Sequence, residues 1–228
     1  MHVPDGFLDA PTSVATGAVA VVAVGISLAK ARHELDDKTA PMAGLVAAFI
    51  FAVQMLNFPV GAGTSGHLMG GALAAVLVGP WTGVLCVSVV LLVQSLLFAD
   101  GGITALGTNI VLMAVTTVLV GWLVFRLLQV LLPKRLSLVP VQAGIAAFVS
   151  VPAAALVFVA LYAVGGTADI PLDTLLSAMV GVHVLIGIGE AVITFLVVAS
   201  IVSVRPDLVH GARRVLAVRE LETRTVSV

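Results

Sequence analysis

The apolar residues of this chain come in long blocks, and this feature limits its fold most. Seven blocks can be drawn, at about 12–29, 41–58, 67–79, 81–98, 106–132, 140–164 and 174–203. Hydrophobic residues make up 60% of the 228 residues and charged residues only 10%, whereas a soluble domain carries about 25% charged residues. The alternation typical of a β-barrel is absent, so helices best satisfy the main chain in lipid. We predict an all-α polytopic membrane protein with seven transmembrane helices.

The basic residues support this count. With seven crossings, alternate loops lie on opposite sides of the membrane, and all 11 Lys and Arg residues fall on one side. These are Lys30, Arg32, Lys38, Arg126, Lys134, Arg135, Arg205, Arg213, Arg214, Arg219 and Arg224. The positive-inside rule then places the amino terminus outside and the carboxyl terminus in the cytoplasm of a cell membrane, plasma or inner. We expect a seven-helix domain over residues 1–205 and a short cytoplasmic tail over 206–228, and a net charge of -1 does not indicate nucleic-acid binding.

The third block is too short to cross a membrane as a helix. From Leu68 to Gly79 it would form about 18 Å of helix, against a hydrocarbon core of about 30 Å. The stretch FPVGAGTSGHLMGG, residues 58–71, is apolar but too rich in glycine to be helical. Non-helical backbone at membrane depth must line a cavity in the protein. We therefore expect His67 at the top of a short helix in a cavity open to the outside; a surface loop with an ordinary histidine is the alternative.

The chain opens MHVPDG, which places His2 beside the terminal amine. The Met1 amine, the deprotonated amide nitrogen of His2 and His2 Nδ1 can close two fused chelate rings on one metal ion. A nitrogen of His67 would complete a square, which favours Ni(II) or Cu(II) over Zn(II) and tolerates Co(II). Pro4 and the VPDG turn would fold the segment back onto the protein, with Met1 retained. The alternative is a disordered terminus with an incidental histidine.

Two ionisable residues of the last block lie within the bilayer. His183 and Glu190 are seven residues apart and share one helix face. Buried ionisable groups in a membrane are functional candidates, and the available polar partners are Gln54, Asn57, Gln94 and Asn109. Asn57, Asn109, His183 and Glu190 are predicted either to support the metal ligands from behind, to form a proton path, or to form a structural network between helices. Residues 100–102, Asp-Gly-Gly, are interpreted as an external turn.

Four separated segments carry a family resemblance. They are MHVPDGFLD, GTSGHLMGGALAAVLVGPW, LLFADGGITALGTNIVLMA and GVHVLIGIGEAVIT. In this order they resemble the cobalt/nickel substrate-capture subunits of energy-coupling factor transporters, the CbiM/NikM family, and the resemblance runs from Met1 to about residue 203. It implies a seven-helix subunit that holds Ni(II) or Co(II) with the Met1 amine, His2 and His67, without an organic cofactor.

The resemblance also implies partners and a mechanism. A transmembrane scaffold subunit and two ATPase subunits would supply energy, and a small two-helix membrane subunit, expected here as a separate polypeptide, would assist metal loading. The loaded subunit would tilt against the scaffold, and ATP hydrolysis would reset it. The chain itself has no G-x-x-x-x-G-K-[ST] motif, which agrees with ATP binding by another chain and with a transport subunit that is not an enzyme.

Three other functions are weighed against this one. A stand-alone secondary nickel or cobalt permease would use Glu190 and His183 as a proton relay. An intramembrane metalloenzyme is disfavoured because a site with four nitrogen ligands leaves no in-plane position for a substrate. A capture subunit for an organic vitamin would need aromatic stacking residues, and only 5% of the chain is aromatic.

Overall fold

The computed structural model describes residues 1–35, 39–61 and 64–218. The basic residues Lys38, Arg219 and Arg224 lie outside these ranges, as does the end of the 206–228 tail. The helices and strands follow in the order α1 (Ala10–Ala31), α2 (Ala40–Gln54), β1 (Phe58–Gly61), β2 (Thr64–Gly66), α3 (Gly71–Val78), α4 (Pro80–Leu97), α5 (Leu106–Asn109), the π-helix η1 (Ile110–Thr116), α6 (Thr117–Leu131), the 3₁₀ turn η2 (Leu136–Leu138), α7 (Val139–Gly165), α8 (Leu172–Val204) and the 3₁₀ turns η3 (Pro206–Leu208) and η4 (His210–Ala212).

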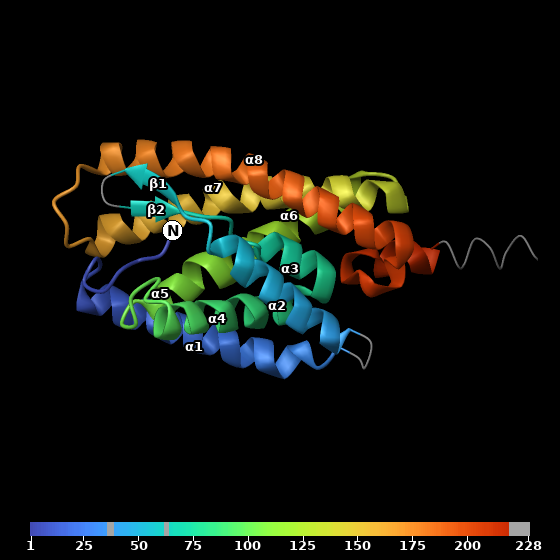
Figure 1. Ribbon diagram of the computed structural model, residues 1–228, viewed down its shortest axis with the longest axis horizontal. Coiled ribbons are helices and arrows are strands. Elements are labelled where there is room, and N and C mark those ends of the chain that lie inside the picture. Colours follow the sequence, from blue (N-terminus) through green and yellow to red (C-terminus); the bar gives the residue numbers. More distant parts are fainter. Residues whose placement is uncertain (36–38, 62–63, 219–228) are drawn as a thin grey trace, which may run out of the picture.

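The helices run roughly along one axis as an elongated bundle, with α8 along one long side and α1 along the other (Figure 1). The amino terminus lies at the same end as the hairpin and the α7–α8 connection, and the last turns of α8 lie at the opposite end (Figure 1). Within the described residues, five helical segments are long and apolar enough to cross a membrane: Ala10–Ala31, Pro80–Leu97, Leu106–Leu131, Leu136–Gly165 and Leu172–Val204.

The predicted all-α class holds, apart from the short hairpin of β1 and β2. Each of the seven predicted apolar blocks contains a helix, but two are short. The block at 41–58 forms the 15-residue α2, and the block at 67–79 forms the eight-residue α3. The number of crossings and the orientation of the termini stay predictions.

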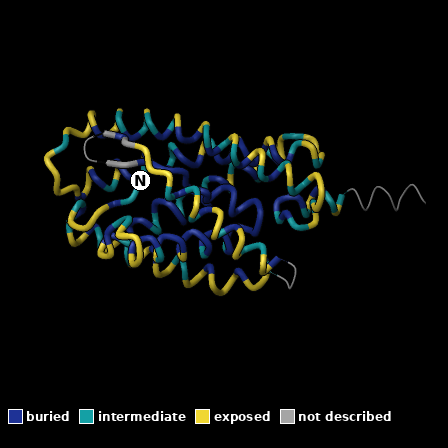
Figure 2. Tube along the Cα trace, viewed as in Figure 1, coloured by how far each residue is buried: buried dark blue, intermediate teal, exposed yellow. Residues whose placement is uncertain are grey.

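Helix α3 forms the centre of the bundle, and all eight of its residues are buried. Figure 2 shows this buried centre surrounded by more exposed helices. Small residues bring the neighbouring helices close: a Cβ added at Gly121 of α6 would lie 2.5 Å from the Ala72 Cβ, and one at Gly83 of α4 would lie 3.1 Å from the Ala75 backbone nitrogen. A helix this short can stay in the core because α4, α6 and α7 cover it and no residue of α3 carries a charge.

The segment predicted to be non-helical is confirmed within the described residues. Phe58 pairs with Gly66 in an antiparallel hairpin, and residues 67–70 form an irregular connection to α3. Gly70 ends this connection with φ of 77°, a left-handed conformation that suits glycine. His67 therefore lies on non-helical backbone four residues before α3, which begins at Gly71 and not at Leu68 as expected.

The first part of the tail packs against the bundle. Val209 and Ala212 are fully buried, and the Gln129 side-chain amide donates to the Gly211 carbonyl over 2.7 Å. A Cβ added at Gly211 would lie 2.8 Å from the Phe125 ring. These described tail residues therefore cover the end of α3 and α6 instead of extending into solvent.

Candidate metal centre

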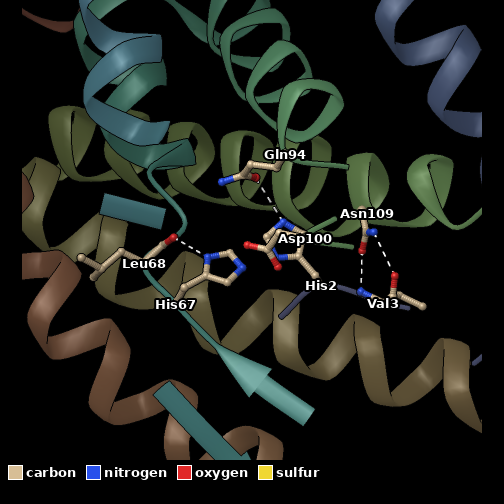
Figure 3. Close-up of polar contacts among 7 residues, drawn as sticks. All are labelled: His2, Val3, His67, Leu68, Gln94, Asp100 and Asn109. Carbon is tan, nitrogen blue, oxygen red and sulfur yellow. Dashed lines mark hydrogen bonds and ion pairs between the residues drawn. The ribbon is translucent and has the colours of Figure 1, made fainter. Parts of the chain in front are cut away.

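The amino-terminal segment is fixed to the protein through its backbone. The Val3 N–H donates to Asn109 Oδ1 over 2.7 Å, and Asn109 Nδ2 donates to the Val3 carbonyl over 3.1 Å. The Gly102 N–H donates to the same carbonyl over 2.9 Å. The amide of Asn109 thus pairs with Val3 as a neighbouring strand would, which holds the first three residues in one place (Figure 3).

The turn after Val3 forms as predicted. The Phe7 N–H donates to the Pro4 carbonyl over 3.3 Å, and Gly6 adopts φ of 77°. Beyond the turn, the Thr167 N–H donates to the Phe7 carbonyl over 3.1 Å. The segment is therefore folded back and held by the loop before α8, so the alternative of a disordered terminus is wrong.

The terminal residue itself is enclosed, with Met1 only 1% exposed. Burial lowers the pKa of its amine from 8.0 to about 4, although the charge of Asp100 acts in the opposite direction. At neutral pH the amine is therefore unprotonated, which is the state that can ligate a metal.

His2 and His67 come together across the site. Their rings stack with centroids 4.5 Å apart and planes 29° from parallel. Figure 3 shows them approaching from different chain segments, with Asp100 and Gln94 beside His2. His2 Nε2 lies 3.2 Å from Gln94 Oε1, and His2 Nδ1 lies 3.1 Å from Asp100 Oδ1. The two histidines that the sequence singled out are thus neighbours.

The tautomer of His67 is set by one hydrogen bond. His67 is fully buried, and its Nδ1 lies 2.8 Å from the Leu68 carbonyl oxygen. A carbonyl only accepts, so Nδ1 carries the proton and Nε2 keeps a free lone pair. Nε2 has no hydrogen-bond partner among the described residues.

Glu190 fixes the connection that follows His67. Its two carboxylate oxygens accept the Met69 N–H over 2.6 Å and the Gly70 N–H over 2.9 Å. Gln54 Nε2 donates to the Met69 carbonyl over 2.7 Å. Helices α8 and α2 therefore hold the two residues after Leu68 through polar side chains, and Glu190 belongs to a network between helices.

The remaining predicted residues lie around the site in different roles. His183 is buried with its Nδ1 2.7 Å from the Met179 carbonyl, and its Nε2 has no partner within the described part of the chain. A Cβ added at Gly66 would lie 3.4 Å from His183 Cε1, so this ring lies beside the residue that precedes His67. Asn57 is exposed and hydrogen-bonds the Asp100 carboxylate.

Sequence reasoning missed Asp100, which it interpreted as part of an external turn. The residue does lie in a turn, but its carboxylate contacts His2. Hydrogen bonding to His2 is the main cause that lowers the pKa of Asp100. The available signal was the acidic residue next to two glycines, because Gly101 permits close approach: a Cβ there would lie 3.0 Å from His2 Cδ2.

The donor set determines what this site can bind. Among the residues that the structure describes, no three His, Cys, Asp or Glu side chains converge as a metal-binding group. The predicted site differs from such a group because it adds the Met1 amine and the His2 amide nitrogen to the two imidazoles. Closing the predicted chelate also requires His2 Nδ1 to turn from Asp100 toward the metal.

Known proteins resemble the chain over most of its length. The family model described as "Cobalt uptake substrate-specific transmembrane region" matches residues 2–208. A protein of Haloquadratum walsbyi, provisionally named as a metal transport protein, is 40% identical over 92% of this chain and 93% of its own length. The fused nickel transport protein NikMN of Rhodobacter capsulatus is 35% identical over 93% of this chain and 65% of its own length. A crystal structure described as a truncated transition metal transporter matches with a TM-score of 0.81 at 33% identity, covering 89% of this chain and 99% of that one. The chain therefore belongs to the CbiM/NikM family of cobalt and nickel transport proteins and is a multi-pass membrane protein.

Proposed function

We propose that this chain is the substrate-capture subunit of an energy-coupling factor importer and that it binds Ni(II) or Co(II) at its amino terminus. Four nitrogens form the proposed site: the Met1 amine, the His2 amide, His2 Nδ1 and His67 Nε2. The observation that carries the proposal is that the ring centroids of His2 and His67 lie 4.5 Å apart, and that the Met1 residue with its amine is buried. A planar set of nitrogens suits Ni(II) and also accepts Co(II).

The protonation states support this ligand set. The His67 ring directs an unprotonated Nε2 into the site because its Nδ1 proton is engaged by the Leu68 carbonyl. The buried amine has a pKa of about 4 and so is neutral at physiological pH. The two fused rings need one further proton to leave the His2 amide, so metal binding releases protons and weakens in acid.

In this proposal Asp100 has two effects on the cation. Its carboxylate occupies His2 Nδ1 before metal binds, and the metal must compete with that contact. Its negative charge also lies close to the amine, where it would attract a divalent ion. The carboxylate would therefore guide the ion into the site and then release the imidazole.

The proposed partners supply the energy. They are a transmembrane scaffold subunit, two ATPase subunits and a small two-helix membrane subunit. We also propose seven crossings, with the metal site facing outward and the basic end in the cytoplasm. The stand-alone permease finds less support, because both oxygens of Glu190 are engaged by backbone N–H groups and so do not form an open proton relay with His183.

The deciding test is calorimetry of Ni(II) binding to the purified protein, with mass spectrometry confirming that the chain starts at Met1. We expect His2→Ala, His67→Ala and chemical blocking of the amine each to weaken binding by about 100-fold or more, because each removes a directly bound nitrogen. One residue inserted between Met1 and His2 should also abolish this form of the chelate. Tight binding by the amine-blocked chain would refute the proposed ligand set.

A matched control is His33→Ala, which removes an exposed histidine at the opposite end of the bundle. It should bind Ni(II) as the parent protein does. Uptake into vesicles tests the coupling separately: vesicles that contain only this chain should not accumulate metal in response to a proton gradient. Accumulation that follows the gradient and ignores ATP would favour the permease instead.

A further inference from the structure

The basic end of the bundle contains a polar cavity far from the metal centre. It has a volume of about 250 Å³ and lies between the end of α6, the α6–α7 connection, the first turn of α7 and the tail. Its polar and charged lining consists of Arg126, Gln129, Lys134, Gln142 and Arg214. Sites for drug-sized molecules usually measure about 300–1,000 Å³, so this cavity suits a small chemical group.

The charge of the lining favours an anion. Three cationic side chains, those of Arg126, Lys134 and Arg214, face the cavity, and no acidic residue lines it in the described part of the chain. Lys134 and Arg214 are exposed. The first turn of the 27-residue α7 also lies at the cavity, and a helix amino terminus adds partial positive charge.

Gln142 adds an independent sign that a ligand belongs there. Its side chain lines the cavity, and the residue is only 2% exposed. Its Oε1 has no hydrogen-bond partner among the described residues. A buried acceptor without a partner costs about 1–3 kcal/mol, so a ligand that brings a hydroxyl or N–H donor would be stabilised here.

The position of the cavity at the end of an apolar helix indicates the source of the ligand. Helix α6 ends at Leu131 directly beside it, and Val130 and Leu131 are 75% and 68% exposed. In a membrane protein these apolar side chains face acyl chains. Lys134 follows the end of this helix by three residues, and Arg126 lies on its last turns. Cations in this position are expected to reach the phosphates of the lipid headgroups. Basic pockets between helices in this position bind acidic headgroups.

We propose that this cavity binds the headgroup of an anionic glycerophospholipid. Its phosphate would be held by Lys134, Arg214 and Arg126, and the hydroxyls of a glycerol headgroup would donate to Gln142. Phosphatidylglycerol has both features. The bound lipid would tie the tail to the α6–α7 connection, because Arg214 belongs to one and Lys134 to the other.

Native mass spectrometry of the full chain can test this by counting bound phosphatidylglycerol and phosphatidylcholine. We expect the anionic lipid to bind more tightly. Each of Lys134→Gln and Arg214→Gln should weaken it about fivefold, since one basic residue near a lipid surface contributes about 1 kcal/mol. The double variant should lose the preference. A matched control, Arg32→Gln combined with Arg205→Gln, removes the same charge from the same end outside the cavity and should retain the preference.

Three outcomes would overturn the proposal. The first is an equal loss of phosphatidylglycerol binding in the control, which would show a general charge effect. The second is displacement of the lipid by glycerol 3-phosphate at equal concentration, which would assign the cavity to a soluble phosphate. The third is normal lipid binding by the double variant together with weaker assembly with the ATPase complex, which would assign the cations to an acidic partner. Ni(II) binding, measured in parallel, is expected to stay unchanged.

Discussion

Two buried glutamates, one within the bundle and one at its basic end, use the same chemistry. Glu190 of α8 accepts two backbone N–H groups, from Met69 and Gly70, just before α3 begins. Glu34, which follows α1, accepts the N–H groups of Trp81 over 3.2 Å and Thr82 over 2.7 Å, in the first turn of α4. Glu34 therefore accepts N–H groups of the first turn of α4, which have no partner within that helix, and Glu190 accepts those of the two residues that precede α3.

Their surroundings differ. Glu190 lies within the bundle, and its two donors are the second and third residues after His67. Glu34 lies at the basic end, where the Arg213 guanidinium donates to its carbonyl over 3.4 Å. A Cβ at Gly79 would lie 2.5 Å from the Glu34 carboxylate carbon, so the glycine admits this cap.

The comparison distinguishes two roles of a buried carboxylate, which are stabilising the start of a helix and positioning a metal ligand. Both glutamates stabilise a helix start, but only Glu190 acts on backbone that carries a proposed metal ligand. Changes that keep the shape and remove the charge should therefore have different effects at the two positions. Stability should fall in both cases, and metal affinity should fall only when Glu190 is changed.

The largest effect is expected for Glu190→Gln. The amide can accept at one oxygen but presents an NH₂ group to the second backbone donor. We expect Ni(II) affinity to fall by about 10–100-fold, as it does when groups supporting a metal ligand are removed, and unfolding free energy to fall by about 1–3 kcal/mol. Calorimetry and thermal unfolding measure the two effects on one sample.

Unchanged affinity in folded Glu190→Gln would contradict a positioning role. The matched control is Glu34→Gln, which makes the same substitution at the other cap. A similar loss of affinity in both variants would mean that general destabilisation, and not the position of His67, governs metal binding.

Asn109→Ala removes the side chain that holds the amino-terminal segment. It removes both side-chain hydrogen bonds to Val3, while the Gly102 N–H still reaches the Val3 carbonyl. Because one backbone contact remains, we expect about a tenfold loss of Ni(II) affinity, at the lower end of the range for such supports. Thr167→Val is a milder control, since it removes the hydroxyl that donates to the Gly6 and Phe7 carbonyls, away from Val3. An affinity for Asn109→Ala equal to that of the control would show that the segment needs no clamp.

Glu34→Gln alone should affect stability only. Losing a helix cap costs about 1 kcal/mol, and Arg213 and Thr82 stay in place to limit the damage. The measurement is the thermal midpoint in detergent, with Ni(II) affinity as the internal check. A midpoint equal to that of the parent protein would show that the cap contributes nothing measurable.

The helical architecture could be predicted because lipid leaves few alternatives for blocks of apolar residues. The shortness of the third helix was also readable, since Gly70, Gly71 and Gly79 bracket it. The hairpin of β1 and β2 was not predicted, because both strands pack against α8 and such long-range contacts cannot be read from a local pattern. The burial of Val209 and Ala212 was equally hidden in a tail that reads as polar.

The residues of the candidate site also divide into those that the sequence predicts and those that it does not. Chemistry singled out Met1 and His2, because a terminal amine, the next amide nitrogen and that residue's imidazole can close fused chelate rings, and His67 as the nitrogen that would complete the square. The roles of Glu190 and Asn109 were left open between support and structure, since a sequence does not say which backbone groups lack partners. Asp100 was missed because its contact with His2 joins residues 98 positions apart.

The smallest expected effect is the dependence of stability on pH, and it concerns Glu34. Burial is the main cause that raises the pKa of Glu34 above its usual 4.5, despite the hydrogen bonds from Thr82 and Trp81. The folded protein therefore holds this proton more tightly than the unfolded chain does. The resulting stabilisation is complete below about pH 4.5 and is lost as the pH rises through the raised pKa. The parent protein should lose stability relative to Glu34→Gln over that interval, as measured by thermal midpoints at a series of pH values. A constant difference between the two proteins across the series would contradict this titration.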